Sequence, residues 1–168
     1  MRDLSARALE EEQMDADDLP PHVYATVLAG LSRVNIATFA FRPTLAFLRE
    51  ASADGAPFRL LDVGYGDGGM LRAIWNWAQK RGVACELVGI DLNPRSEAVA
   101  LARHPQGANI AYRTGDYAGL TQQPWDFIIS SLVTHHMSDA QRLAFLIFME
   151  AHARRRSEEH TSELQSPM

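Results

Sequence analysis

The chain has 168 residues, which is enough for one domain with a sizeable core, and its 46% apolar and 22% charged residues are ordinary for a globular protein. A net charge of −5 argues against nucleic acid as a partner, because phosphate binding relies on basic surface. No apolar run reaches the roughly 18 residues of a membrane span, and the N-terminus lacks the apolar stretch of a signal peptide. The single cysteine, Cys85, excludes an intrachain disulfide and a thiolate metal cluster, so we expect a cytoplasmic protein without a metal site.

Two helices are predicted ahead of the main domain. Residues 1–18 are polar and acidic and predict a loose lead-in. After them, apolar residues recur at helical spacing in PPHVYATVLAGLSRV (20–34) and again in PTLAFLREA (43–51). Prolines suit a helix start, and Pro43 keeps the two helices apart. We assign residues 19–53 to a helical cap.

From residue 54 to residue 155 short apolar runs alternate with amphipathic helices. The predicted strands are FRLLDVG (58–64), CELVGID (85–91), NIAYRTGD (109–116) and WDFIISSLV (125–133). The helices between and after them are predicted at 69–82, 93–104 and 138–155. Such alternation predicts an α/β fold with a doubly wound parallel sheet and helices on both faces.

The last residues are treated separately. From Arg156 the chain reads RSEEHTSELQSPM, which has no apolar periodicity and resembles, codon for codon over its first eleven residues, a translated sequencing-library adapter. A natural disordered tail is the alternative that polar composition favours. We interpret residues 156–168 as a foreign tail and exclude them from the fold. These residues carry one Arg and three Glu, so the net charge without them is −3. We expect the natural protein to continue beyond Arg155.

The first strand runs into a glycine loop, Asp62-Val63-Gly64-Tyr65-Gly66-Asp67-Gly68-Gly69. Glycines there allow a tight turn and a close approach of the backbone to a ligand, at the N-terminus of the next helix. The loop satisfies the dinucleotide pattern G-x-G-x-x-G, which would make the chain a nicotinamide-dependent oxidoreductase. It also satisfies D-x-G-x-G-x-G, the glycine-rich motif of class I methyltransferases that use S-adenosylmethionine (SAM). A tight turn without a ligand is the third possibility.

Acidic residues end the next two predicted strands. Asp91 closes LVGID, where a carboxylate can accept both ribose hydroxyls of an adenosine, although it also suits a local turn because Asn93-Pro94 follow. Asp116 and Tyr117 follow the third strand. The fourth strand ends near Ser131 and continues into paired histidines.

These four motifs, in this order over residues 20–155, resemble the class I methyltransferases related to the ubiquinone/menaquinone methyltransferases. The resemblance implies a Rossmann-like sheet with strand order 3-2-1-4, SAM as the cofactor, and a small-molecule acceptor, with a phenolic or quinone-like hydroxyl preferred. It implies that Asp62 and the glycine loop hold the methionine end, Asp91 the ribose, and Asp116 and Tyr117 the adenine. The full set of expected cofactor-binding residues is Asp62, Gly64, Tyr65, Gly66, Gly68, Asp91, Leu92, Asp116, Tyr117 and Ser131.

His135 and His136 are the candidate catalytic residues. Either histidine could remove the proton of an acceptor hydroxyl, since histidine titrates near neutral pH; helix capping or packing is the alternative. Adjacent histidines rarely converge on one metal ion. By the same resemblance, Arg33 or Asn35 of the helical cap could lie near the methyl donor, and a polar surface role is the alternative.

The segments for the remaining strands of the resembled family are absent after residue 155. We therefore expect a sheet that ends at its fourth strand, with an unpaired edge. A further hypothesis is that this chain is a non-catalytic fragment of an enzyme. The sequence does not indicate an oligomeric state.

Overall fold

The computed structural model describes residues 20–37, 40–131 and 133–160. Its helices are α1 (Pro21–Ala37), α2 (Arg42–Ala51), α3 (Gly69–Arg81), α4 (Pro94–Leu101) and α5 (Asp139–His152), with short 3₁₀ helices η1 (Tyr117–Leu120) and η2 (Thr134–His136). Its strands are β1 (Phe58–Val63), β2 (Cys85–Asp91), β3 (Ile110–Thr114), β4 (Trp125–Ser131) and β5 (Ala153–His160). No helix within these residues is long and apolar enough to cross a membrane.

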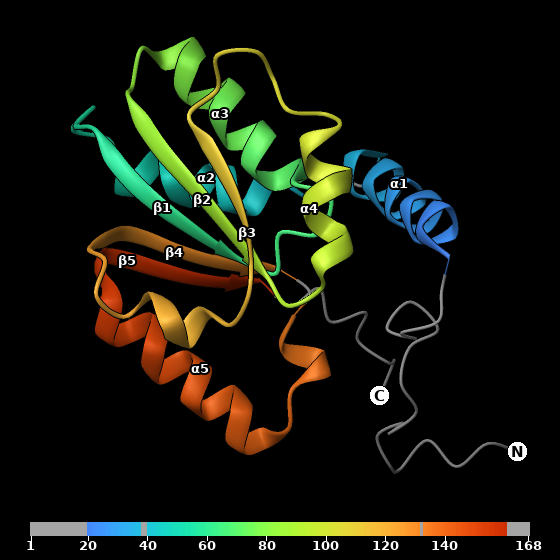
Figure 1. The fold of residues 1–168 in the computed structure, drawn as a ribbon. Coiled ribbons are helices and arrows are strands. Elements are labelled where there is room, and N and C mark those ends of the chain that lie inside the picture. Colours follow the sequence, from blue (N-terminus) through green and yellow to red (C-terminus); the bar gives the residue numbers. More distant parts are fainter. Residues whose placement is uncertain (1–19, 38–39, 132, 161–168) are drawn as a thin grey trace, which may run out of the picture.

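The five strands form one parallel sheet in the order β3-β2-β1-β4-β5 (Figure 1). The first four positions confirm the predicted order, and the α/β doubly wound class is confirmed with them. The strand order changes direction between β1 and β4, which is where ligands bind in open α/β sheets.

The prediction that the sheet ends at its fourth strand is wrong. Helix α5 ends at His152 rather than at residue 155, and β5 starts at the next residue and pairs with β4 from Trp125↔Ala153 to Ser131↔His160. Excluding residues 156–160 from the fold is therefore also wrong, whereas residues 161–168 lie outside the described part. The adapter origin of this tail stays a prediction.

Backbone pairing and one arginine explain why a polar segment forms a strand. The edge of β4 offers backbone groups to a neighbour whatever its side chains, and an unpaired edge of a buried strand is unfavourable. Arg155 also fixes β5 against α2, because its guanidinium donates to the Ala51 carbonyl at 2.7 Å and to Asp54 at 2.9 Å. The same guanidinium lies over the Phe127 ring, 5.1 Å from its centre.

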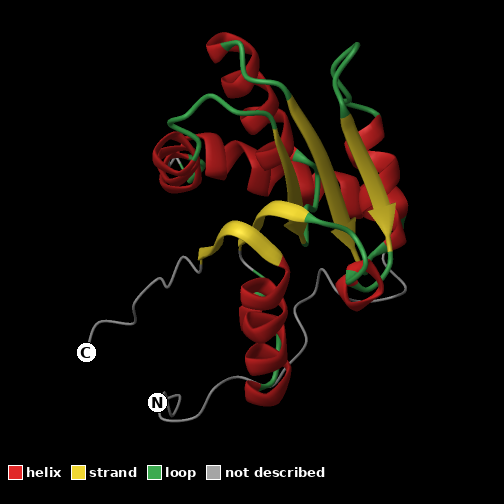
Figure 2. Cartoon of the chain, turned by 90° about the vertical axis from the view of Figure 1, so that its left-hand side faces the viewer, coloured by secondary structure: helices red, strands yellow, loops and turns green. Residues whose placement is uncertain are grey.

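Each face of the sheet packs against its own helices (Figures 1 and 2). On one face Leu60 and Phe127 pack with Leu48 of α2 and Ile74 of α3. The opposite face packs against α5 and η1, and its core includes Leu61, Val88, Trp125, Phe145 and Met149. The alternation of Leu60 and Leu61 between the two cores is the period-two pattern of a strand buried on both sides.

Helix α1 lies beside α4 and is fixed there by Tyr24 (Figure 1). The Tyr24 hydroxyl and the Ser96 hydroxyl share a buried hydrogen bond of 2.9 Å. The guanidinium of Arg95 lies over the Tyr24 ring, 4.6 Å from its centre. This contact brings α1 to the carboxyl ends of the strands, where Tyr24 and Leu28 line a cavity.

Candidate functional site

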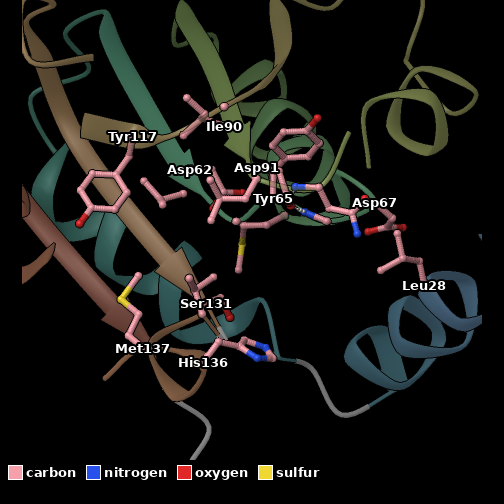
Figure 3. Close-up of a pocket in the computed structure, with 18 of the residues that line it drawn as sticks. Leu28, Asp62, Tyr65, Asp67, Ile90, Asp91, Tyr117, Ser131, His136 and Met137 are labelled. Atoms are coloured by element: carbon pink, nitrogen blue, oxygen red, sulfur yellow. Dashed lines mark hydrogen bonds between the residues drawn. The ribbon is translucent and has the colours of Figure 1, made fainter. Parts of the chain in front are cut away.

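A cavity of about 430 Å³ lies at the carboxyl ends of the strands, beside the change of strand direction (Figure 3). Segments far apart in the sequence contribute to its wall, among them α1, the loop after β1, the ends of β2 and β4, and η2. The predicted cofactor-binding residues that line it are Asp62, Gly64, Tyr65, Gly66, Asp91, Leu92, Tyr117 and Ser131. Two predicted residues, Gly68 and Asp116, are not part of this lining.

The glycine loop turns sharply through left-handed backbone at Gly64 and Gly66, whose φ angles are +79° and +55°. A Cβ atom at Gly64 would lie 2.1 Å from the Val133 side chain, so this position requires glycine for packing. At Gly66 a Cβ would meet only Leu28, at 3.9 Å. Gly66 therefore leaves open the cavity that Leu28 lines from the other side.

Gly68 packs closely against a neighbouring strand, and its predicted part in cofactor binding stays a prediction. It precedes α3 with a φ of +73°, and a Cβ there would lie 2.7 Å from the Tyr112 ring. The glycine at 68 thus allows the loop to pack on β3.

Asp91 joins the glycine loop to the turn after β2. Its Oδ2 accepts a hydrogen bond from the Gly66 amide and its Oδ1 accepts one from the Asn93 amide, both at 2.9 Å. These amides fix the plane of the carboxylate at the cavity wall. Since each carboxylate oxygen can accept more than one hydrogen bond, both remain able to bind hydroxyl groups of a ligand.

Asp62 is a buried carboxylate at the end of β1. Only 2% of the residue is exposed, and its Oδ2 has no hydrogen-bond partner among the described residues. Burial, with the nearby charge of Asp91, raises the pKa of Asp62 to about 7. A buried acceptor of this kind beside a cavity is suited to a cationic or hydrogen-donating group of a ligand.

Of the residues at the predicted adenine side, Leu92 and Tyr117 line the cavity and Asp116 does not. Tyr117 lines the cavity with its ring packed on Phe145 and Phe148, and burial raises the pKa of its hydroxyl. Leu92 is 76% exposed at the cavity wall. Asp116 is exposed, and its carboxylate accepts a hydrogen bond from the Ala118 amide at the start of η1.

Of the two histidines, His136 lines the cavity from η2. Figure 3 shows it next to Ser131, on the side of the cavity that faces Asp62 and Tyr65. His135 lies in the same short helix, and its side chain is outside the described part, as are the side chains of Arg33 and Asn35. Their predicted roles stay predictions.

Residues of the cap, and one residue after η2, also line the cavity. They were not among the predicted site residues. Tyr24, Leu28 and Phe41 come from the cap, and Met137 follows η2. The helical spacing of Tyr24 and Leu28 was a usable signal, because it puts both on one face of α1. Their direction toward the cavity depends on how α1 packs on α4, which local sequence does not determine.

Comparison with models of known protein families identifies a match over more than half of the chain. The model of the family described as "Methyltransferase domain" matches residues 60–156. A comparison with curated protein sequences finds no match.

Solved structures share the fold at low identity. The magnesium protoporphyrin IX methyltransferase of Synechocystis PCC 6803, solved with bound SAH, is 18% identical with a TM-score of 0.57, over 87% of this chain and 62% of that one. A putative S-adenosyl-L-methionine-dependent methyltransferase of Methanococcus maripaludis is 12% identical with a TM-score of 0.60, over 93% of this chain and 68% of that one. The plantazolicin methyltransferase BamL, solved with a substrate analogue and SAH, is 17% identical with a TM-score of 0.59, over 76% of this chain and 47% of that one. This chain thus spans less than two thirds of the Synechocystis protein.

Proposed function

The chain belongs to the methyltransferase domain family, and from that premise we propose that it transfers a methyl group from SAM to a small-molecule acceptor. The observation that carries the proposal is the pairing of Asp62 with Asp91 in one cavity. A buried carboxylate oxygen of Asp62, for which the described part of the chain provides no hydrogen-bond partner, lies there beside the Asp91 carboxylate, which two backbone amides hold in place.

The residues of the cavity fit the parts of SAM in order. Asp62 provides an acceptor for the ammonium group of the methionine end, next to the glycine loop. The two oxygens of Asp91 provide acceptors for the ribose hydroxyls. Leu92 and Tyr117 offer an apolar side chain and an aromatic ring for the adenine, while Asp116 stays a proposed adenine partner from outside the cavity wall.

SAM, when bound, supplies a methyl group on a positively charged sulfur, which a nucleophile can take by in-line displacement. The protein then has to align the acceptor and keep water out. His136 lines the cavity beside Ser131, and we assign to His136 the removal of the proton from the acceptor hydroxyl. His135 is kept as the second candidate for this role.

Part of the cavity lining suits an apolar acceptor. The lining includes the apolar residues Leu28, Phe41, Val133 and Met137, together with His136. A flat, apolar molecule with one ionisable hydroxyl, such as a phenol, matches this combination. The names of two relatives of similar fold, which act on a protoporphyrin and on plantazolicin, are in keeping with a small-molecule acceptor.

Two other functions were considered from the sequence. Family membership disfavours the nicotinamide-dependent oxidoreductase, since the glycine loop lies within the matched methyltransferase segment. The other hypothesis, a non-catalytic fragment, predicts that this chain does not methylate an acceptor.

Calorimetric titration with S-adenosylhomocysteine, and with NAD in parallel, tests the proposed cofactor. We expect micromolar binding of S-adenosylhomocysteine alone, and at least tenfold weaker binding after Asp91→Ala, about 1.4 kcal/mol. Asp126→Ala, at the opposite end of the sheet, serves as the matched control. Binding of NAD alone would overturn the proposal.

A further inference from the structure

Two arginines hold Asp67, the acidic residue between Gly66 and Gly68 of the glycine loop. Its Oδ2 lies 3.0 Å from Nη2 of Arg72 in α3 and 3.0 Å from Nη1 of Arg103, which follows α4. The Asp67 side chain is 11% exposed and that of Arg72 is 16% exposed, whereas that of Arg103 is 42% exposed. Arg103 therefore ties the loop to a segment 36 residues away along the chain.

Backbone groups next to Asp67 also hold its carboxylate in place. Its Oδ1 accepts a hydrogen bond from the Gly69 amide at 2.9 Å, and Arg72 also donates to the Asp67 carbonyl. A Cβ atom at Gly69 would lie 2.9 Å from the same Oδ1, so only glycine leaves the carboxylate in this position. The loop conformation at the start of α3 thus depends on where Asp67 is held.

The charges around the loop suggest why two arginines are present. Asp62, Asp67 and Asp91 line the cavity, and none of its described lining residues is a lysine or an arginine. The amino-acid end of SAM carries a carboxylate as well as an ammonium group, and three uncompensated aspartates would repel that carboxylate. Two guanidiniums flank the Asp67 carboxylate, so this cluster of three side chains carries a net positive charge.

We propose that Arg72 and Arg103 are positioning residues that hold Asp67 and the glycine loop in the form that accepts the amino-acid end of the cofactor. This inference rests on the proposed function. Arg72 and Arg103 are not among the described residues that line the cavity, and they act through Asp67, which does line it. Arg103 is the residue to test, because its side chain is partly exposed and lies outside the two hydrophobic cores.

The experiment compares two ligands that differ at the amino-acid end. S-adenosylhomocysteine carries the amino acid, and 5′-methylthioadenosine has the same adenosine and thioether sulfur without it. Dissociation constants for both are measured with the native protein, Arg103→Met, Arg103→Lys, and the control Arg49→Met on the exposed side of α2. Melting temperatures of the four proteins are measured without ligand.

We expect Arg103→Met to weaken S-adenosylhomocysteine roughly 3- to 10-fold, in line with a partly buried charged contact, and to leave 5′-methylthioadenosine unchanged. Arg103→Lys should restore part of the loss, and Arg49→Met should behave like the native protein. Equal S-adenosylhomocysteine affinity in Arg103→Met and the native protein overturns the inference. A parallel loss for both ligands together with a lower melting temperature also overturns it, because that pattern is purely structural. If the native protein binds 5′-methylthioadenosine but not S-adenosylhomocysteine, the proposed function itself fails.

Discussion

The carboxylates of Asp62 and Asp91 lie at the ends of two adjacent parallel strands, and the charge of Asp91 adds to the burial that raises the pKa of Asp62 to about 7. Asp62 therefore ionises near neutral pH, at a cost in stability that a cationic ligand can offset. Several measurable properties depend on this pair.

Replacing Asp62 by Asn should change how stability depends on pH. The folded pKa of about 7 lies above the ordinary value of 3.8, so between these two pH values the unfolded chain loses its proton while the folded protein keeps it. The free energy of unfolding contributed by Asp62 is fully present below about pH 4 and is lost as pH rises to about 7. Asp62→Asn removes this loss and should be more stable than the native protein at pH 8, by up to about 4 kcal/mol.

Urea denaturation at pH 4.5, 6 and 8 measures the difference. The gap between Asp62→Asn and the native protein should widen with pH and stop widening above about pH 7. Parallel stability profiles for the two proteins would show that Asp62 is not held protonated in the fold.

Cofactor affinity should rise with pH over the same interval. An ionised Asp62 pairs with the ammonium group of S-adenosylhomocysteine, so the dissociation constant should fall by up to roughly tenfold between pH 5.5 and 8, about 1.4 kcal/mol. Asp62→Asn should bind more weakly and show little pH dependence. The matched ligand 5′-methylthioadenosine, which lacks the ammonium group, should bind independently of pH; a shared pH dependence would contradict the assignment of Asp62 to the amino-acid end.

A methyl group at position 66 should block the ligand without unfolding the protein. In Gly66→Ala the new Cβ enters the side of the cavity that Leu28 lines, while the positive φ costs of order 1 kcal/mol. Gly107→Ala is the matched control, because Gly107 has a φ of +75° with nothing within 4 Å of its Cβ. Both variants should lose similar stability by thermal melting, and only Gly66→Ala should bind S-adenosylhomocysteine at least tenfold more weakly, about 1.4 kcal/mol. Equal affinities in the two variants would exclude Gly66 from the binding surface.

The sequence pattern was sufficient for the first four strands. Strands β1, β2 and β4 are largely apolar runs that end at a polar or glycine residue, and β3 alternates buried Ile110 and Tyr112 with exposed residues. Leu60 and Leu61, or Ile128 and Ile129, are fully or almost fully buried on opposite faces of the sheet, as such runs predict. Strand β5 has no such pattern. Its position depends on backbone pairing with β4 and on the contact of Arg155 with Asp54, which are long-range features.

In the candidate site, too, some residues could be predicted from the local sequence and others depend on long-range packing. Asp62, Asp91 and the glycine loop follow strand ends directly, so the topology alone brings them together. Asp116 has a local alternative, since its carboxylate accepts from the Ala118 amide and begins η1. The cap residues Tyr24 and Leu28 reach the cavity only through the packing of α1 on α4, which no local pattern reveals.

Replacing His136 should slow methyl transfer without weakening cofactor binding. Loss of a general base costs about 100-fold or more in kcat, so His136→Ala and His136→Asn should both show this loss on a phenolic acceptor. His22→Ala, an exposed histidine of α1, is the control. Release of S-adenosylhomocysteine measures turnover, and calorimetry measures binding. If His136→Ala keeps the native kcat, another group removes the proton, and His135 is the next residue to test.

Replacing Tyr24 by Phe should loosen the cap while the sheet stays intact. The variant keeps the ring under Arg95 and removes only the hydroxyl that bonds to Ser96, a residue with no exposed surface. Leaving the Ser96 hydroxyl unpaired in a buried place costs about 1–3 kcal/mol, and most of that cost falls on the docking of α1 against α4.

Hydrogen exchange of the backbone amides separates the cap from the sheet. In Tyr24→Phe the amides of α1 should exchange faster, while those of β1 and β2 keep their native rates, and S-adenosylhomocysteine should bind more weakly because Tyr24 and Leu28 line its cavity. Thr26→Ala, an exposed change on the same helix, controls for general helix destabilisation. Faster exchange in α1 without any loss of affinity would mean that the cap packs over the cavity but does not contribute to holding the cofactor.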